Sequence, residues 1–232
     1  MMRAMQATQG KREMTTQAQS QWPRALATPP ETPYPPAPWR AQAQYWAGLF
    51  RSDRPASLSA GLRPLLGAHT RVVTLVRYLP GSTLVYDELI IATPALIGAR
   101  PGLAIEYIWV DSLASLWGGR RIWGLPKELA DFEWSERGVR VSDASGPLMM
   151  LDVNRSPAHG PALPLATAGI GRLGDAWAYS VFPARMRLGR AGMRLRDLSP
   201  RFGFTLGERP LLAVASRDCR VTFPPARLIS TR

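Results

Sequence analysis

Short runs of Val, Ile, Leu and Tyr recur along the chain from about residue 39, and turn-forming residues separate them. Runs of this length and composition are typical of β-strands. Residues 71–79 and 83–93 are two such runs, and Pro80-Gly81-Ser82 between them predicts a tight hairpin turn. Further short strands are predicted at residues 104–110, 130–135, 138–143, 147–153, 203–206, 210–216 and 219–223.

Helical segments are few in this pattern. Asp111 is placed to cap a short helix over residues 112–117, which Gly118-Gly119 would end. A second helix is predicted over residues 55–66. Many closely spaced strands with few helices predict a mainly β chain with some α-helix, built as an antiparallel barrel or sandwich.

The composition changes near residue 37. Residues 1–36 are rich in Gln, Thr, Ala and Pro, which predicts a disordered, Pro-rich N-terminal tail, and residues 37–232 are predicted to form a single domain. The tail carries no apolar segment of the kind that a secretory signal needs. The longest apolar stretch, residues 84–97, is interrupted by charged residues and a proline, and it falls short of the roughly 18–20 residues of a membrane-spanning helix. We therefore expect a cytoplasmic protein with no membrane partner.

Positive charge is the main feature of the composition. The formal net charge is +12, with 29 Lys and Arg against 17 Asp and Glu. The densest run of arginines, residues 185–201, has few aromatic residues and no nucleic-acid-binding motif. We interpret it as a solvated basic face or loop and expect no specific nucleic-acid partner. A nucleic-acid-binding surface is the alternative, and such binding would have to survive physiological salt.

The lysines are more informative than the net charge. Of the 29 basic residues only Lys11 and Lys127 are lysines, and Lys127 follows Gly124-Leu125-Pro126. A guanidinium stays protonated and is a poor nucleophile, whereas a buried lysine can lose its proton and attack a carbonyl group. A lysine in a chain that otherwise uses arginine therefore indicates amine chemistry, although a chance surface lysine remains possible on this ground alone.

Other catalytic groups have weaker support. Cys219 is the single cysteine, which excludes an intrachain disulfide framework, and a small buried apolar side chain is its expected role. His69 and His159 lack the spacing of metal ligands, so we expect neither a metal nor an organic cofactor. Residues 118–121, Gly-Gly-Arg-Arg, lack the flanking residues of a phosphate-binding loop.

Three stretches of the sequence carry a resemblance. Residues 110–112 (Val-Asp-Ser), 118–120 (Gly-Gly-Arg) and 123–130 (Trp-Gly-Leu-Pro-Lys-Glu-Leu-Ala) resemble, in order and spacing, the signature of the acetoacetate decarboxylase family. Upstream, Tyr86-Asp87-Glu88 falls where that family has a Tyr-x-Glu segment. The agreement runs from about residue 38 to residue 135 and more loosely to the C-terminus.

The resemblance implies a fold and a chemistry. The fold would be a barrel or cone of antiparallel strands with short flanking helices. The activity would be that of a lyase acting on a small keto acid or related carbonyl compound, in which Lys127 forms a Schiff base and Glu88 acts as the proton donor and acceptor. The substrate-binding residues would be Tyr86, Arg120 and Leu125. The resemblance also implies a homo-oligomer, and Trp39, Trp46, Trp134 and Trp177 are candidates for its subunit contacts.

The alternation of side chains along the strand does not show whether Glu88 lies on the buried face. Glu88 shares one face of an extended segment with Leu84, Tyr86 and Ile90. The opposite face, Val85, Asp87, Leu89 and Ile91, is equally apolar, so the periodicity does not say which face is buried.

Two departures from the family pattern keep other functions open. Glu128 stands where the best-known member has a second lysine, and on an extended strand it would point away from the pocket while Lys127 points inward beside Leu125 and Leu129. The arginine expected after Trp39 is missing, because residues 42–45 read Gln-Ala-Gln-Tyr. The alternatives are an aldolase–dehydratase acting on a keto acid and a non-enzymatic small-molecule-binding β-barrel.

Overall fold

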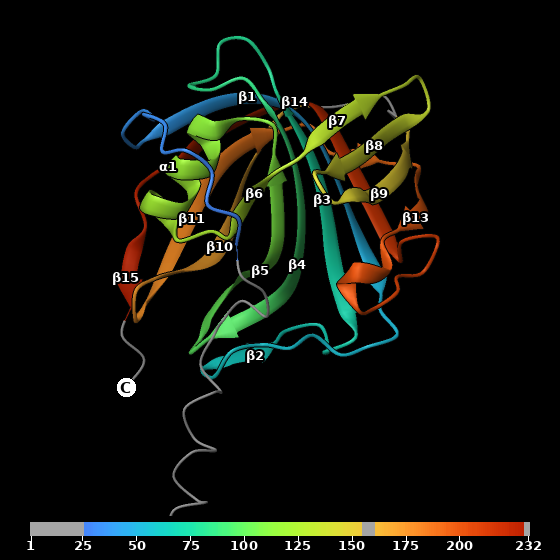
Figure 1. The fold of residues 1–232 in the computed structure, drawn as a ribbon, viewed down its shortest axis with the longest axis horizontal. Helices are drawn as coiled ribbons and strands as arrows, with labels where there is room; N and C mark the ends of the chain where they lie inside the picture. The colour runs from blue at the N-terminus through green and yellow to red at the C-terminus, as the bar shows by residue number, and fades with distance from the viewer. Residues whose placement is uncertain (1–25, 155–160, 230–232) are drawn as a thin grey trace, which may run out of the picture.

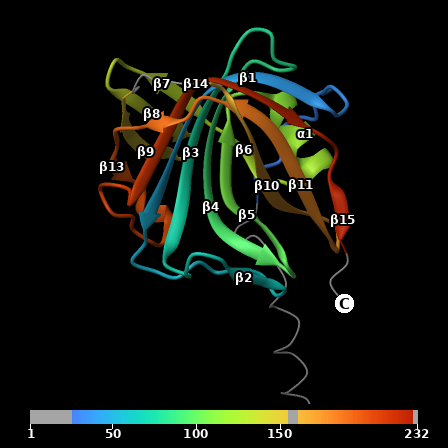
Figure 2. The ribbon, with the colours of Figure 1, turned by 180° about the vertical axis from the view of Figure 1, so that it is seen from behind.

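Seven long strands close into a barrel (Figure 1). The structure is a computed structural model that describes residues 26–154 and 161–229. Around the barrel the strands follow the order β14 (Leu212–Phe223), β1 (Trp39–Arg51), β3 (Thr70–Tyr78), β4 (Asp87–Ile97), β5 (Arg100–Val110), β10 (Leu163–Leu173) and β11 (Ala176–Met186), which pairs with β14 again. Figure 2 shows these strands from behind.

The barrel is mixed in strand direction, which corrects the antiparallel prediction. β10 runs parallel to β5, and the short strand β6 (Lys127–Leu129) also pairs with β5 in parallel. A parallel pair needs a long crossover connection. The chain provides one here, because it forms α1 (Leu113–Trp123) between β5 and β6, and three of the four strands of a second sheet between β6 and β10.

The second sheet covers one side of the barrel. Its strands are ordered β13 (Met193–Leu198), β9 (Gly146–Val153), β8 (Gly138–Asp143) and β7 (Asp131–Trp134). Leu151 and Met149 of this sheet pack in one core cluster with Trp46, Leu75 and Leu89 of the barrel strands. The remaining elements lie at the barrel edges: β2 (Leu62–Pro64), β12 (Gly189–Arg190), β15 (Arg227–Ile229) and the 3-10 helix Pro200–Phe202.

Strand β4 is buried on both faces. Leu89 and Ile91 pack against the second sheet, whereas Glu88 and Ile90 point into the barrel. A strand that is covered on both sides has no polar face. The pattern of apolar and polar residues therefore could not show which side of the strand Glu88 is on. The structure thus places Glu88 in the barrel interior.

Helix α1 packs against strands β5, β6, β10 and β11 of the barrel and is longer than predicted. It begins after Ser112, whose side chain accepts a hydrogen bond from the Ser115 amide, and it ends at Gly124 in the left-handed conformation. The predicted stop at Gly118-Gly119 is wrong, because both glycines lie inside the helix at positions of close approach. A Cβ on Gly118 would meet the Trp39 ring. Within the described residues, no helix is both long enough and apolar enough to cross a membrane.

Several other local predictions also need correction. Residues 55–66 form no helix, because the backbone there turns and then pairs with β4 as β2. Residues 203–206 form no strand of their own, and residues 210–216 and 219–223 belong to the single strand β14. Strands β1, β10, β11 and β13 were not predicted.

The tryptophans proposed for subunit contacts lie within the chain. Trp39, Trp46 and Trp177 are at most 4% exposed, and they pack in the protein's own core. Trp134 is partly buried and donates a hydrogen bond to Asp87. Those side chains therefore give no support to a homo-oligomer, which stays a prediction.

Part of the predicted tail packs against helix α1. Residues 26–36 contain no helix or strand, but their carbonyl groups accept hydrogen bonds from the Trp117 indole, at Pro30, and from the Arg120 guanidinium, at Ala27. Residues 1–25 lie outside the described residues. The domain boundary at residue 37 remains a prediction.

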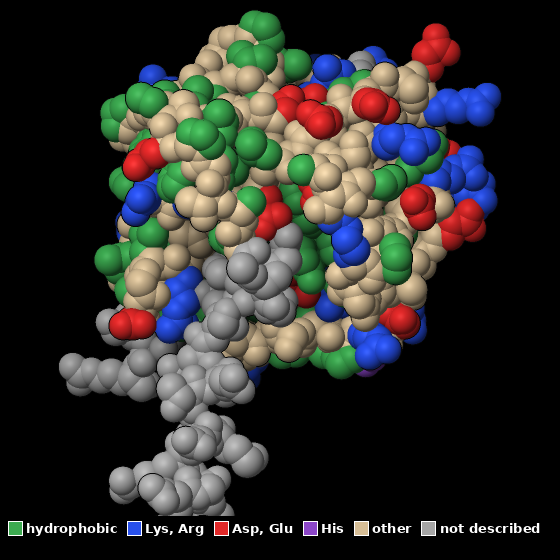
Figure 3. All heavy atoms as spheres, in the orientation of Figure 1, with side chains coloured by type: hydrophobic (Ala, Val, Ile, Leu, Met, Phe, Trp, Pro, Cys, Tyr) green, Lys and Arg blue, Asp and Glu red, His purple; other side chains and the backbone are tan. Residues whose placement is uncertain are grey.

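The arginine run at residues 185–201 is mostly not a loop. It contains strand β13, and three of its arginines form ion pairs: Arg194 with Glu208, Arg196 with Asp152, and Arg201 with Asp143. Figure 3 shows basic and acidic side chains interspersed on the side of the molecule that carries the second sheet. This mixture fits a solvated surface better than a continuous basic patch.

An ion pair between strands β3 and β5 is largely buried. Arg71 on β3 pairs with Glu106 on β5 at 3.1 Å, and their side chains are 3% and 15% exposed. The Arg71 guanidinium also donates to Ser52 Oγ and to the Arg54 carbonyl, and it lies over the Phe204 ring at 3.9 Å. Thr93 donates to the Glu106 carboxylate at 2.6 Å.

We predict that Glu106→Gln destabilises the protein by about 3 kcal/mol, because it leaves the buried Arg71 charge without a counter-ion. The matched control is Glu208→Gln, which breaks the exposed pair with Arg194 and should change stability by less than about 1 kcal/mol. Chemical denaturation of both variants measures the difference. Equal losses in the two variants would contradict the prediction.

Candidate functional site

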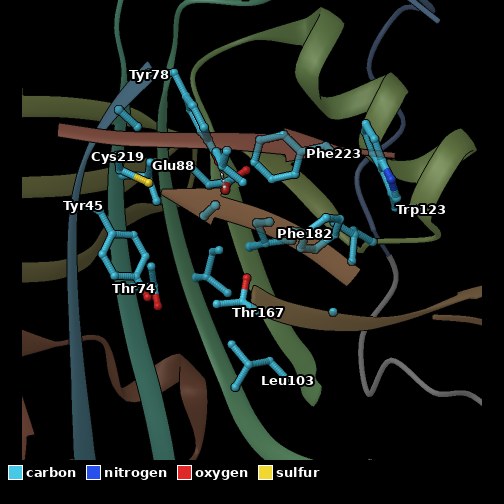
Figure 4. Close-up of a pocket in the computed structure, with 18 of the residues that line it drawn as sticks. Tyr45, Thr74, Tyr78, Glu88, Leu103, Trp123, Thr167, Phe182, Cys219 and Phe223 are labelled. Carbon is cyan, nitrogen blue, oxygen red and sulfur yellow. Dashed lines mark hydrogen bonds between the residues drawn. The ribbon is translucent and has the colours of Figure 1, made fainter. Parts of the chain in front are cut away.

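The barrel encloses a cavity of about 130 Å³ beneath helix α1 (Figure 4). Its wall is mainly apolar and aromatic. The residues that line it include Tyr45, Thr74, Tyr78, Tyr86, Glu88, Trp123, Leu125, Lys127, Thr167, Phe182, Cys219 and Phe223.

Lys127 reaches the cavity from strand β6. Its side chain is 4% exposed, and Nζ lies 2.6 Å from Glu88 Oε2. Nζ also donates to Ser115 Oγ at 2.9 Å and lies 3.5 Å from the Tyr86 hydroxyl. The predicted residues Lys127, Glu88 and Tyr86 therefore meet at one point. Along the chain, Lys127 is 39 residues from Glu88 and 41 residues from Tyr86.

Two tyrosines hold the Glu88 carboxylate. Tyr78 donates to Oε1 at 3.1 Å and Tyr86 to Oε2 at 3.4 Å, and the two rings stack with centroids 4.3 Å apart. Burial raises the pKa of Tyr78 and of Tyr86 well above the usual value for a phenol, and the neighbouring Glu88 carboxylate adds to both shifts. Both hydroxyls therefore keep their protons and act as donors to Glu88.

Helix α1 supplies the other wall around the amine. Ser115 and Gly119 are four residues apart and so lie on the same face of the helix. A Cβ on Gly119 would lie 2.4 Å from Lys127 Cδ, so only glycine leaves room for the lysine side chain against the helix. Ser115 and Tyr78 were not predicted from the sequence as site residues. The four-residue spacing of Ser115 and Gly119 was the only signal for the first of them.

The other predicted site residues take different positions. Leu125 lines the cavity, but Leu129 is 38% exposed, so the expectation that it lies beside Lys127 is wrong. Glu128 is not among the cavity-lining residues, although it is buried at 8% exposure.

Arg120 lies behind the site and not in it. Its Nε donates to the Lys127 carbonyl at 2.8 Å, and its Nη1 donates to the Ala27 carbonyl. Partial burial lowers the pKa of Arg120, and the nearby Glu128 opposes this shift. Because the guanidinium is not part of the cavity wall, its position fits support of the Lys127 backbone and not the predicted contact with substrate.

The sequence matches the model of one protein family. The model of the acetoacetate decarboxylase (ADC) family matches residues 25–158, which is more than half of the sequence. The chain belongs to this family. No curated protein matches it.

Solved structures of acetoacetate decarboxylase-type proteins share the fold. The acetoacetate decarboxylase of Legionella pneumophila subsp. pneumophila str. Philadelphia 1 is 18% identical over 88% of this chain and 92% of that one, with a TM-score of 0.63. An acetoacetate decarboxylase-like enzyme from Sphingomonas wittichii RW1 is 18% identical over 90% and 100%, with a TM-score of 0.58. The enduracididine biosynthesis enzyme MppR, solved with pyruvate, is 20% identical over 89% and 93%, with a TM-score of 0.56.

The part of the cavity wall formed by Tyr45, Thr74 and Cys219 is polar but uncharged. Burial raises the pKa of Tyr45 to about 12, and the neighbouring Thr74 side chain opposes part of this shift. Burial raises the pKa of Cys219 to about 11. Near neutral pH, these three side chains therefore offer only uncharged hydrogen-bonding groups to a ligand in the cavity. Among the described residues, no three His, Cys, Asp or Glu side chains are grouped so that they could hold a metal ion.

We predict that Gly119→Ala displaces the Lys127 amine without unfolding the protein. Alanine is favoured over glycine in a helix by about 1 kcal/mol, which offsets part of the cost of moving the Lys127 side chain, so we expect the variant to stay folded. The added methyl group overlaps the Lys127 side chain, and a displacement of this kind can slow reaction at the amine by about 10²-fold. Thermal unfolding and the rate of borohydride trapping of a ketone at Lys127 measure the two effects.

The control for this variant is Gly207→Ala. Gly207 is exposed, and the nearest atom to an added Cβ is the Arg209 carbonyl oxygen at 3.6 Å. This variant should trap at the wild-type rate. A wild-type rate in Gly119→Ala as well would show that Gly119 does not position the amine.

Proposed function

We propose that this member of the acetoacetate decarboxylase family is a carbon–carbon lyase in which Lys127 forms a Schiff base with a small carbonyl substrate. The observation that carries the proposal is the Lys127–Glu88 contact. The amine and the carboxylate lie 2.6 Å apart, with side chains 4% and 5% exposed, at the wall of a largely apolar cavity.

The first requirement of this chemistry is a neutral amine. Transfer of one proton from Nζ to the adjacent Glu88 carboxylate produces this amine and leaves two uncharged groups. The free amine then attacks the carbonyl carbon, and the carbinolamine loses water to give the iminium. Glu88 can return its proton to the departing hydroxyl group, because it lies beside Nζ.

The iminium then serves as an electron sink. When the bond between the α-carbon and a carboxylate or a β-carbinol carbon breaks, its electron pair forms an enamine. Glu88 is placed to exchange the protons of this step, and Tyr78 and Tyr86 hold the carboxylate in register. Hydrolysis of the imine releases the product and regenerates Lys127.

Two reactions use this same iminium. One is decarboxylation of a β-keto acid, and the other is aldol cleavage, or the reverse condensation with dehydration. The aldolase–dehydratase alternative is favoured by the cavity wall, since no arginine is among its described residues. A solved structure of MppR holds the condensation product of pyruvate and imidazole 4-carboxaldehyde, so the fold accommodates aldol chemistry in that protein.

A non-enzymatic binding barrel is less well supported. That alternative would be favoured by a solvent-exposed lysine, whereas Lys127 is 3% exposed and is surrounded by three hydrogen-bonding side chains. A buried amine needs partners for its charge and its protons, and the three side chains that supply them hold Lys127 at the cavity wall, where a carbonyl ligand can reach it.

We predict that borohydride reduction with a ketone or keto acid attaches the substrate to Lys127. Peptide mass spectrometry locates the adduct cleanly, because Lys11 is the only other lysine. Lys127→Arg keeps a cation beside Glu88 but cannot form the imine, so its adduct should disappear. Lys11→Arg is the matched control and should label as the wild type does. If no carbonyl compound in a broad panel labels Lys127, the Schiff-base proposal is wrong.

We predict that Glu88→Gln lowers kcat by about 10²–10⁴-fold, because the amide keeps the shape of the side chain but cannot take up a proton. Turnover of the carbonyl compound that labels Lys127 fastest measures the effect. Glu136→Gln changes an exposed glutamate far from the cavity wall and should leave kcat unchanged. A Glu88→Gln variant with more than half of the wild-type kcat would remove Glu88 from the mechanism.

A further inference from the structure

The cavity carries no net charge. Among the described residues that form its wall, Lys127 and Glu88 are the only two with side chains that are charged near neutral pH. Whichever of the two holds the shared proton, their charges sum to zero. Tyr45, Tyr78 and Tyr86 keep their protons because burial raises the pKa of each phenol.

The arginines of the surrounding strands are engaged outside the cavity. Arg71 on β3 pairs with Glu106, and Arg77 on the same strand pairs with Asp87 at 3.3 Å and lies over the Trp134 ring. Arg40 on β1 is exposed on the barrel surface. Arg120 is bound to the Lys127 carbonyl. None of these four is part of the cavity wall.

Among the described residues, no group is therefore free to act as the counter-ion of a substrate carboxylate in this site. Moving an unpaired carboxylate from water into an apolar site is unfavourable by several kcal/mol even after relaxation. The Lys127–Glu88 pair supplies no net attraction for the incoming charge, because its two charges cancel whichever group holds the shared proton.

The remaining wall favours an apolar, ring-shaped substituent. The rings of Phe182 on β11 and Phe223 on β14 lie 5.0 Å apart, and Trp123 at the end of α1 lies 6.2 Å from Phe223. Figure 4 shows these three side chains on one side of the cavity, with Tyr45 and Thr74 on the other. An engineered cavity of about 150 Å³ holds benzene, so the volume of about 130 Å³ here suits a substituent of that order.

We propose that the substrate of Lys127 is an uncharged carbonyl compound, namely a ketone or aldehyde with an apolar substituent, and not a keto acid. This inference rests on the proposed Schiff-base function and narrows its substrate class. The covalent step is balanced within the site: the amine and the carbonyl group give an imine and one water, with no oxidant or reductant. The neutral hydroxyls of Tyr45, Thr74 and Thr167 supply hydrogen bonds for an uncharged polar group of the substrate.

The test compares two ligands that differ in charge and little in shape. In 5-methyl-2-hexanone an isopropyl group replaces the carboxylate of 4-oxopentanoate, and neither compound loses CO2. We expect the wild-type protein, reduced with borohydride under matched conditions, to label at Lys127 at least about tenfold faster with the neutral ketone than with the keto acid. Lys127→Arg serves as the control for labelling elsewhere.

The outcomes separate this inference from the function on which it rests. Labelling by 4-oxopentanoate at an equal or higher rate would overturn the uncharged-substrate proposal and leave the Schiff base intact. Labelling by neither compound would count against the Schiff base itself.

A variant tests whether cavity charge is the cause. Tyr45→Arg introduces a cation of similar length into the cavity wall, and it should reduce the preference for the neutral ketone at least about threefold, as expected for a partly screened charge pair. Retained labelling by 5-methyl-2-hexanone shows that the variant is folded. An unchanged preference in the folded variant would contradict the inference.

Discussion

The contact between Lys127 and Glu88 is the interaction on which the site depends. An amine and a carboxylate 2.6 Å apart, both almost fully buried, require a structure that removes water and satisfies every remaining polar atom. Tyr78, Tyr86 and Ser115 meet that requirement with hydrogen bonds. The barrel supplies the carboxylate and the phenols, and the crossover through helix α1 and β6 supplies the amine and the serine. The parallel pairing of β6 with β5 therefore brings the Lys127 amine to the Glu88 carboxylate.

Strand β4 is covered on both faces, and this keeps Glu88 away from water. The second sheet packs on Leu89 and Ile91, so the outer face of β4 is as dry as the inner one. Glu88 consequently sits in a strand that has no exposed side, and its backbone is fixed by pairing with β3 and β5. A carboxylate held in this way cannot turn toward water, and the pairing partners available to it are those of the cavity.

The sequence supported the barrel class and brought forward Lys127, Glu88, Tyr86 and Leu125, all of which line one cavity in the structure. The local pattern of residues did not predict β1, because Gln, Ala and Gly interrupt its aromatic residues, and the segment is a strand through its pairing with β3 and β14. Nor could it predict the length of α1. Paired glycines usually end a helix, and here tertiary contacts with Trp39 and Lys127 outweigh that tendency. Tyr78 and Ser115 were missed because only barrel closure brings them to Glu88 and Lys127.

The position of Arg120 explains why a cation in the family signature does not make the cavity cationic. Its guanidinium is used on the backbone, where it binds the carbonyl of Lys127 and ties helix α1 to strand β6 and to residue 27. Glu128, next to Lys127 in the sequence, lies outside the cavity wall and acts on Arg120. The charge of this acidic residue therefore acts on the arginine behind the site, and it is not part of the cavity wall. The departure at Glu128 and the apolar wall are in this sense two parts of one electrostatic arrangement, in which all charge other than the Lys127–Glu88 pair is kept behind the site.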